Sequence, residues 1–138
     1  VETNTNTPVV AEVLAHYNGS ASGSGSATLT GTAEPASRWI VPQVGAAGLT
    51  TVLAVANPNV RPVTVDVAVV RAGDVGRPAD LQGIEIAANQ RFGVDLRDAA
   101  GPGAALVVTA SDPVVVERSL YGAGDASRAA MIPARDGT

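Results

Sequence analysis

The sequence has no cysteine and no lysine, and it is poor in aromatic residues. Without cysteine the chain has no disulfide, no thiolate nucleophile and no zinc–thiolate site. Because aromatic residues make up only 3%, a core must be built from valine, alanine, leucine and isoleucine. The nine basic residues are all arginines and lie scattered along the chain. Nucleic-acid binding needs clustered cations, so we expect no nucleic-acid partner.

Long hydrophobic runs are also missing. No stretch reaches the roughly 18 consecutive apolar residues typical of a transmembrane helix, so we expect no membrane-spanning segment. No signal peptide is visible, although Val1 is consistent with a mature or trimmed chain. The hydrophobic share is 46% and the net charge is −4 over 138 residues. These values indicate one folded, acidic domain with its own core rather than a disordered chain.

What the sequence does contain is valine in alternation with other residues. Between Pro62 and Arg71 every second residue from Val63 to Val69 is valine, which is the period of a half-buried strand. Glycine, proline and asparagine separate this segment from other short apolar segments. The predicted strands are residues 8–17, 38–42, 49–56, 62–71, 81–87, 91–96, 104–110 and 114–121. We therefore predict an all-β, antiparallel β-sandwich of about seven to nine short strands. An up-and-down barrel fits the aromatic-poor composition less well.

One phrase occurs twice in the chain. Pro8-Val9-Val10-Ala11-Glu12, followed by His16-Tyr17, returns as Pro113-Val114-Val115-Val116-Glu117, followed by Leu120-Tyr121. The two Pro-Val-Val phrases are offset by 113 − 8 = 105 residues, about one small domain. Such spacing is typical of tandem arrays, so the first copy is interpreted as the end of another repeat or a strand copied from it.

The composition divides the chain into three parts. We predict an extended tail over 1–7, a copied strand with a Gly/Ser-rich linker over 8–36, and a β-sandwich module over 37–138. The linker chemistry is concentrated in residues 18–26. Asn18-Gly19-Ser20 also matches a glycosylation sequon, but Asn-Gly is a common hairpin turn and we favour the turn.

The order of motifs along residues 37–121 resembles a family of exported repeats from GC-rich bacteria. The matching residues are Trp39, Ala56-Asn57-Pro58-Asn59, Pro62-Val63-Thr64-Val65, the segment 87–96 ending in Val94-Asp95-Leu96, and the segment 111–121 containing Glu117-Arg118. The chain is similar to the uncharacterised domain DUF5719 and its tandem-repeat relatives. The resemblance implies an immunoglobulin-like, surface-exposed and repeated module, with no catalytic residue to carry over. Ala88, where the family often has a glycine or a proline-led turn, and a short C-terminal loop depart from the pattern.

The reactive side chains do not form a recognisable catalytic set. His16 is the only histidine, it lies in the copied strand, and no lysine can replace it as a base. Paired acids such as those of glycosidases could come from Glu12, Asp95, Asp98, Asp112 and Glu117, but these acids suit solvated strands and turns. A calcium site using Asp95 with Asp98, or Asp125 with Asp136, lacks any repeated Asp-x-Asp spacing. We expect no enzyme activity, no cofactor and no metal.

Two further positions have alternative interpretations. Trp39 either fills the core between two sheets or stacks on a sugar at the rim, and its place in a short strand favours the core. Glu117 and Arg118 are adjacent on a strand, so they point to opposite faces. The one that faces inward needs a partner, and we expect a buried or inter-module salt bridge there.

These observations favour a non-enzymatic structural or adhesion module, extracellular or on a bacterial cell surface. Its partners would be other copies of itself or neighbouring repeats. The copied segment, with Pro8, Val9, Val10, Glu12 and Leu14, is a candidate for strand donation to a neighbour, which would give a head-to-tail filament. The alternative is a module that binds carbohydrate or cell-wall glycan through loops 73–80 and 99–103.

Overall fold

The computed structural model describes residues 9–19, 23–30, 32, 34–44 and 49–122. Within these residues the chain forms nine strands, one 3₁₀ turn and no α-helix. The elements are β1 (Glu12–Gly19), β2 (Gly23–Thr30), β3 (Ala36–Val41), β4 (Leu49–Ala56), β5 (Val63–Arg71), β6 (Asp74–Gly76), the 3₁₀ turn η1 (Ala79–Leu81), β7 (Ile84–Ile86), β8 (Arg91–Asp95) and β9 (Ala105–Gly122).

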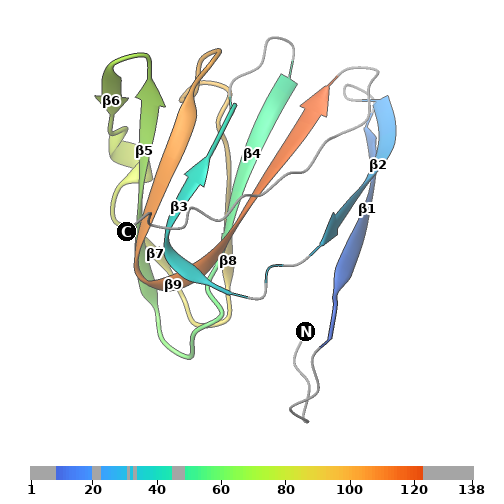
Figure 1. Ribbon diagram of the computed structural model, residues 1–138, viewed down its shortest axis with the longest axis horizontal. Helices are drawn as coiled ribbons and strands as arrows, with labels where there is room; N and C mark the ends of the chain where they lie inside the picture. Colours follow the sequence, from blue (N-terminus) through green and yellow to red (C-terminus); the bar gives the residue numbers. More distant parts are fainter. Residues whose placement is uncertain (1–8, 20–22, 31, 33, 45–48, 123–138) are drawn as a thin grey trace.

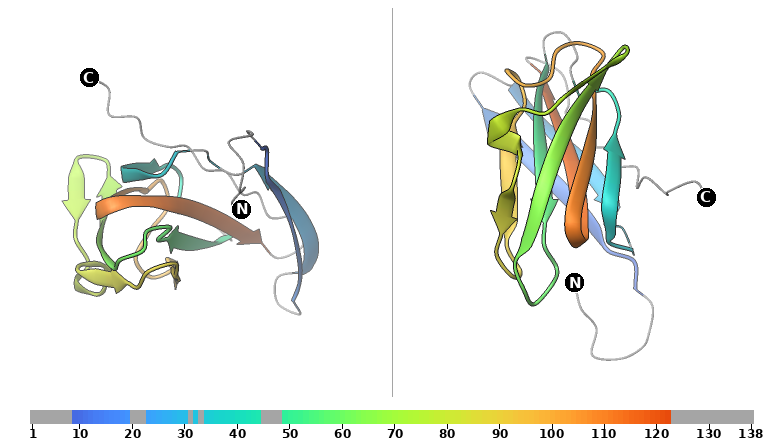
Figure 2. Two further views of the ribbon diagram at one scale, coloured as in Figure 1. Left: turned by 90° about the horizontal axis from the view of Figure 1, so that it is seen from below. Right: turned by 90° about the vertical axis from the view of Figure 1, so that its left-hand side faces the viewer.

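The strands from β3 to β9 form two antiparallel layers that share one long strand (Figure 1). In the first layer, β3 and β5 flank the first half of β9, and β6 and β7 pair with the other edge of β5. In the second layer, β4 lies between β8 and the second half of β9. The views in Figure 2 show how β9 bends from one layer into the other. The prediction of an all-β, antiparallel, sandwich-like fold is confirmed.

Alternating apolar residues build the core between the layers. The four valines of β5 that share one face, Val63 to Val69, are all buried, and so are Leu53 and Val55 of β4. Burial of one such side chain contributes about 1.5–3 kcal/mol, so the repeated pattern supplies much of the stabilisation of the fold. Trp39 of β3 belongs to the same cluster and is only 1% exposed. Its interpretation as a core residue is confirmed.

Strand β9 differs from the prediction. Two strands separated by a turn at Ser111-Asp112-Pro113 were expected, but one strand runs from Ala105 to Gly122. Its pairing with β3 shifts from Arg38↔Thr109 to Ala36↔Val114, so β3 advances by two residues while β9 advances by five. The extra residues form an irregular bulge that bends the strand, and a proline is tolerated there because a bulge leaves backbone groups unpaired.

The region around β7 also differs in detail. A strand was predicted over residues 81–87, but Leu81 ends the 3₁₀ turn η1 and only Ile84–Ile86 are paired, with β5. Gln82 fixes this arrangement, because its side-chain amide donates to the carbonyl of Val67 at 2.8 Å. The short strand β6 was not predicted, and it forms a hairpin with β5 in which Gly73 has a φ of 81°.

The N-terminal residues form a separate hairpin. Strand β1 pairs with β2 along its whole length, from Glu12↔Thr30 to Gly19↔Gly23, and neither strand belongs to the seven-stranded sheet. The linker predicted over residues 18–26 is therefore wrong for 23–26, which lie in β2. The predicted turn at Asn18-Gly19 is also wrong, since both residues lie in β1 and the chain reverses after them. The pairing with β1 overrides the weak strand preference of glycine and serine.

Candidate interaction site

The N-terminal arm, defined as residues 9–19 and 23–30, exposes apolar side chains that nothing in the core covers. Val9, Val10, Val13 and Leu14 are each more than half exposed, and Val10 reaches 84%. Among the side chains that the structure describes, none from the arm belongs to the buried core cluster. A two-stranded hairpin is only marginally stable alone in water, so these exposed side chains point to a missing neighbour.

The strand-donation residues lie on this arm. Val9 and Val10 immediately precede β1, and Glu12 and Leu14 belong to it; Pro8 lies outside the described residues. Cross-strand pairing places Glu12 opposite Thr30 and Leu14 opposite Thr28. Val13 is opposite Leu29 and points to the other side of the hairpin, because successive residues of a strand face opposite ways. One side of the arm thus carries Val13 and Leu29, and the other carries mainly polar residues.

The second half of β9 is the part of the sandwich that matches the arm in sequence. Residues 115–122 pair with β4 on one edge, and within the described residues no strand pairs with their other edge. A strand edge of this kind carries a row of unpaired N–H and C=O groups that can accept a further strand.

Glu117 and Arg118 lie on this stretch, with different environments. Glu117 is on the outer face and forms an ion pair of 3.2 Å with Arg91 of β8. Arg118 is only 6% exposed, and its Nη1 donates to the backbone carbonyls of Pro42 and Gln43. An inward-facing polar residue was predicted, and Arg118 occupies that position. Its partners are carbonyl groups, whereas a salt bridge was expected.

The burial of Arg118 has an electrostatic consequence. Its Nε has no hydrogen-bond partner among the described residues, and desolvation lowers the pKa of the guanidinium from its usual value. Carbonyl dipoles replace only part of the hydration that a buried cation loses. Arg118 therefore connects the segment after β3 to β9 at a cost in desolvation free energy. Its hydrogen bonds fix the position of that segment more than they stabilise the fold.

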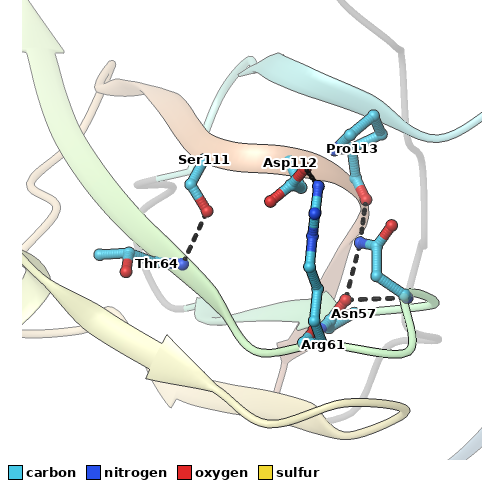
Figure 3. A network of polar contacts seen from close by, with 7 residues as sticks. Asn57, Arg61, Thr64, Ser111, Asp112 and Pro113 are labelled. Atoms are coloured by element: carbon cyan, nitrogen blue, oxygen red, sulfur yellow. Dashed lines mark hydrogen bonds and ion pairs between the residues drawn. The ribbon is translucent and has the colours of Figure 1, made fainter.

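A polar network joins the turn after β4 to the bulge of β9 (Figure 3). Asn57 is 2% exposed, and its Nδ2 donates to the carbonyls of Arg61, Ile86 and Ala87 at 2.8, 3.0 and 3.1 Å. Its Oδ1 accepts from the backbone N–H of Asn59 at 2.9 Å and from the Asn59 side chain at 2.8 Å. This one buried amide satisfies the backbone of the turn and of the strand β7.

The same network reaches the bulge directly. Asn59 donates through Nδ2 to the carbonyl of Pro113 at 2.8 Å, and Arg61 pairs with Asp112 at 2.5 Å. Ser111 accepts a hydrogen bond of 3.1 Å from the backbone of β5. The polar groups of the bulge thus form hydrogen bonds and an ion pair, which explains why β9 continues through Ser111-Asp112-Pro113. In the sequence, the Asn57-Pro58-Asn59 motif indicated a turn. It did not indicate the hydrogen-bond partners of that turn, which lie more than 50 residues away in the chain.

The remaining candidate residues lie mostly at the surface, and Glu12, His16, Asp95 and Asp98 are all exposed. His16 belongs to β1. Asp95 accepts a hydrogen bond of 2.9 Å from the Nε of Arg97, which lies two residues further along the chain. In the described part of the chain no three acidic or histidine side chains lie close enough to hold a metal ion. No helix found there is long and apolar enough to cross a membrane. Asp125 and Asp136, the other calcium pair, lie outside the described residues.

Comparison with known proteins adds no relative: no family model, no curated protein and no solved structure matches this chain. The similarity to the exported repeat family therefore stays a prediction.

Proposed function

We propose that this protein is a non-enzymatic structural or adhesion module of a bacterial cell surface that assembles head to tail through its N-terminal arm. The observation that carries the proposal is the exposed apolar arm, a paired hairpin that lies outside the seven-stranded sheet and exposes Val9, Val10, Val13 and Leu14. The extracellular location is part of the proposal and follows from the family resemblance.

The sandwich restricts how the arm can bind. The phrase that leads into the arm's β1 is repeated in β9, and the second half of β9 already pairs with β4 from Leu49↔Gly122 to Ala56↔Val115. A donated strand cannot take this place in an intact copy. It must instead add to an edge of the sandwich that is free, as in β-strand addition.

The glycan-binding alternative has lost its main candidate residue. Trp39 is buried, and its Nε1 donates to the carbonyls of Ala36 and Val114 at 2.8 and 3.0 Å. A ring held in the core in this way cannot stack on a sugar, so no observation favours that alternative over assembly.

Sedimentation velocity over a range of protein concentrations tests the proposal. The full chain is expected to form larger species as concentration rises, whereas a chain that begins at Thr32 stays monomeric and keeps the circular dichroism signal of the strands of the sandwich. Val13→Asp should reduce assembly, because it places a charge on the apolar side of the arm. Val60→Asp is the matched control, since Val60 is 90% exposed on a sandwich loop away from the arm. A full chain that stays monomeric at all concentrations would refute the proposal.

A further inference from the structure

We propose that the arm of one copy binds the free edge of β9 in a second copy, with β2 of the arm pairing antiparallel to residues 117–122. This inference rests on the proposed function and names the two surfaces that would make the contact. The result would be a continuous sheet in the order β1, β2, β9, β4, β8, with the first two strands supplied by the neighbouring molecule.

The edge of β9 is the least protected edge of the sandwich. Proteins shield free edges by making them short, charged or interrupted by proline. Strands β6 and β7 each have three residues, β8 has five and carries exposed Arg91 and Asp95, and β3 is flanked by Pro35 and Pro42. Residues 115–122 form an eight-residue edge without proline. Their only charges are Arg118, which points inward, and Glu117, which is paired with Arg91.

The arm itself shows which strand fits this edge. Pro8 to Glu12 repeats Pro113 to Glu117 with one substitution, and β1 begins at Glu12, so β1 follows the first copy of the phrase as residues 118–122 of β9 follow the second. In the structure β1 is covered along all eight residues by β2. β2 therefore has the backbone length to pair with the residues of β9 that follow the second copy. The outer edge of β2 has no proline and no charge to prevent this.

The two ends of the repeat predict registers that differ by one residue, since Pro8 and Pro113 are 113 − 8 = 105 residues apart whereas Tyr17 and Tyr121 are 121 − 17 = 104 apart. Only the register of 105 residues matches the faces. Since Leu14 pairs with Thr28, Ser119 should lie opposite Thr28 of the neighbour, and Arg118 opposite Leu29. Ser119 and Thr28 would then share the outer, solvated face. Leu29 would lie on the same side as buried Arg118, next to the core. A shift by one residue would reverse both placements, so the register is specified.

A second copy is the occupant that we infer, since the arm is held away from its own β9. Both Figure 1 and the left view of Figure 2 place the hairpin beyond the C-terminal end of β9, outside the sheet. Only residues 31–35, including Pro35, join β2 to β3. A short hinge of this kind favours exchange between copies. The contact joins two different surfaces, so it does not close and it gives a linear assembly.

Engineered cysteines test the contact, because the chain has none of its own. Thr28→Cys and Ser119→Cys are placed in separate molecules, mixed, and oxidised with oxidised glutathione. We expect a disulfide-linked heterodimer that forms about tenfold faster than with the control pair Thr28→Cys and Thr64→Cys, owing to the higher effective concentration at a bound edge. Thr64 is a suitable control because it is an exposed threonine of β5 in the other layer.

A double variant with Thr28→Cys and Ser119→Cys in one chain distinguishes the alternatives. A ladder of linked oligomers supports the inference, whereas a disulfide within monomers overturns it, since the arm would then fold back on its own β9. If the unmodified protein assembles but this pair does not cross-link faster than the control, the β9 edge is the wrong surface and the proposed function survives. If the unmodified protein does not assemble, both are refuted. Retention of the β-strand signal in circular dichroism confirms that each variant is folded.

Discussion

Replacement of Asn57 by alanine should strongly destabilise the sandwich. The side chain of Asn57 lies where the turn after β4 meets β7 and, through Asn59, the bulge of β9. Its two amide hydrogens are shared among three carbonyls, and its oxygen accepts two hydrogen bonds. Alanine removes all of these and leaves the buried carbonyl of Ile86 without this partner.

The size of the expected destabilisation follows from the number of hydrogen bonds that Asn57 makes and from their burial. The net contribution of one hydrogen bond to the free energy of unfolding is about 1 kcal/mol, and a buried polar group left without a partner costs about 1–3 kcal/mol. With two donors and one acceptor lost at a 2% exposed side chain, we expect a decrease of about 3 kcal/mol in the free energy of unfolding. For a chain of 138 residues this corresponds to a decrease in Tm of roughly 10 °C, at an unfolding entropy of about 2.1 cal/mol/K per residue.

Two further variants separate hydrogen bonding from volume. Asn57→Asp has nearly the same size but replaces the donor group by an oxygen that faces three carbonyls, so it should be at least as destabilising at neutral pH as alanine. Asn59→Ala, at a half-buried position, should cost only about 1 kcal/mol.

Urea unfolding monitored by circular dichroism, with thermal unfolding as a second measurement, provides the values. A decrease below about 1 kcal/mol for Asn57→Ala would refute the reasoning, because it would mean that water replaces the amide at no cost. Equal effects of Asn57→Ala and Asn59→Ala would show that the outer part of the network, and not the buried amide, holds the turn.

The other predictions concern the tryptophan, the buried arginine and an exposed ion pair. Trp39→Phe keeps an aromatic ring but leaves two carbonyls without their indole donor, so urea unfolding should show a loss of about 1–3 kcal/mol, and an unchanged stability would contradict the role of this bond. Arg118→Ala should lower the unfolding free energy more than Arg118→Met, since methionine fills the space without a buried charge; the reverse order would show that the bonds to the carbonyls dominate. Arg97 lowers the pKa of Asp95 mainly through a side-chain hydrogen bond, so the stabilisation by Asp95 is present above the unfolded pKa of about 3.9 and is lost as pH falls through the lower folded value. Asp95→Asn should therefore cost less than about 1 kcal/mol at pH 7 and nothing measurable near pH 2, as followed by thermal unfolding across pH; a larger effect in acid would contradict the assigned sign.

The candidate site was only partly predictable from sequence. The repeated phrase correctly drew attention to the N-terminal strand and to Glu117-Arg118, because similarity within a chain needs no structural information. That β1 would be covered by a strand rich in glycine and serine was not predictable from propensity, which favours a linker for residues 23–26. The partners of Arg118 were equally hidden, since Pro42 and Gln43 lie 76 and 75 residues away.

The sequence alone determined the class of fold and the inward face of the strand that became β5. A period of two is a local property, so Val63 to Val69 indicated both the strand and its buried side without reference to any neighbour. Only the tertiary structure decided that β9 continues through Pro113, because this depends on polar partners from the turn after β4 and from β5. It also decided which edges stay free. Pairing between strands joins residues far apart in the chain, and hydrophobic alternation carries no information about which strand lies beside which.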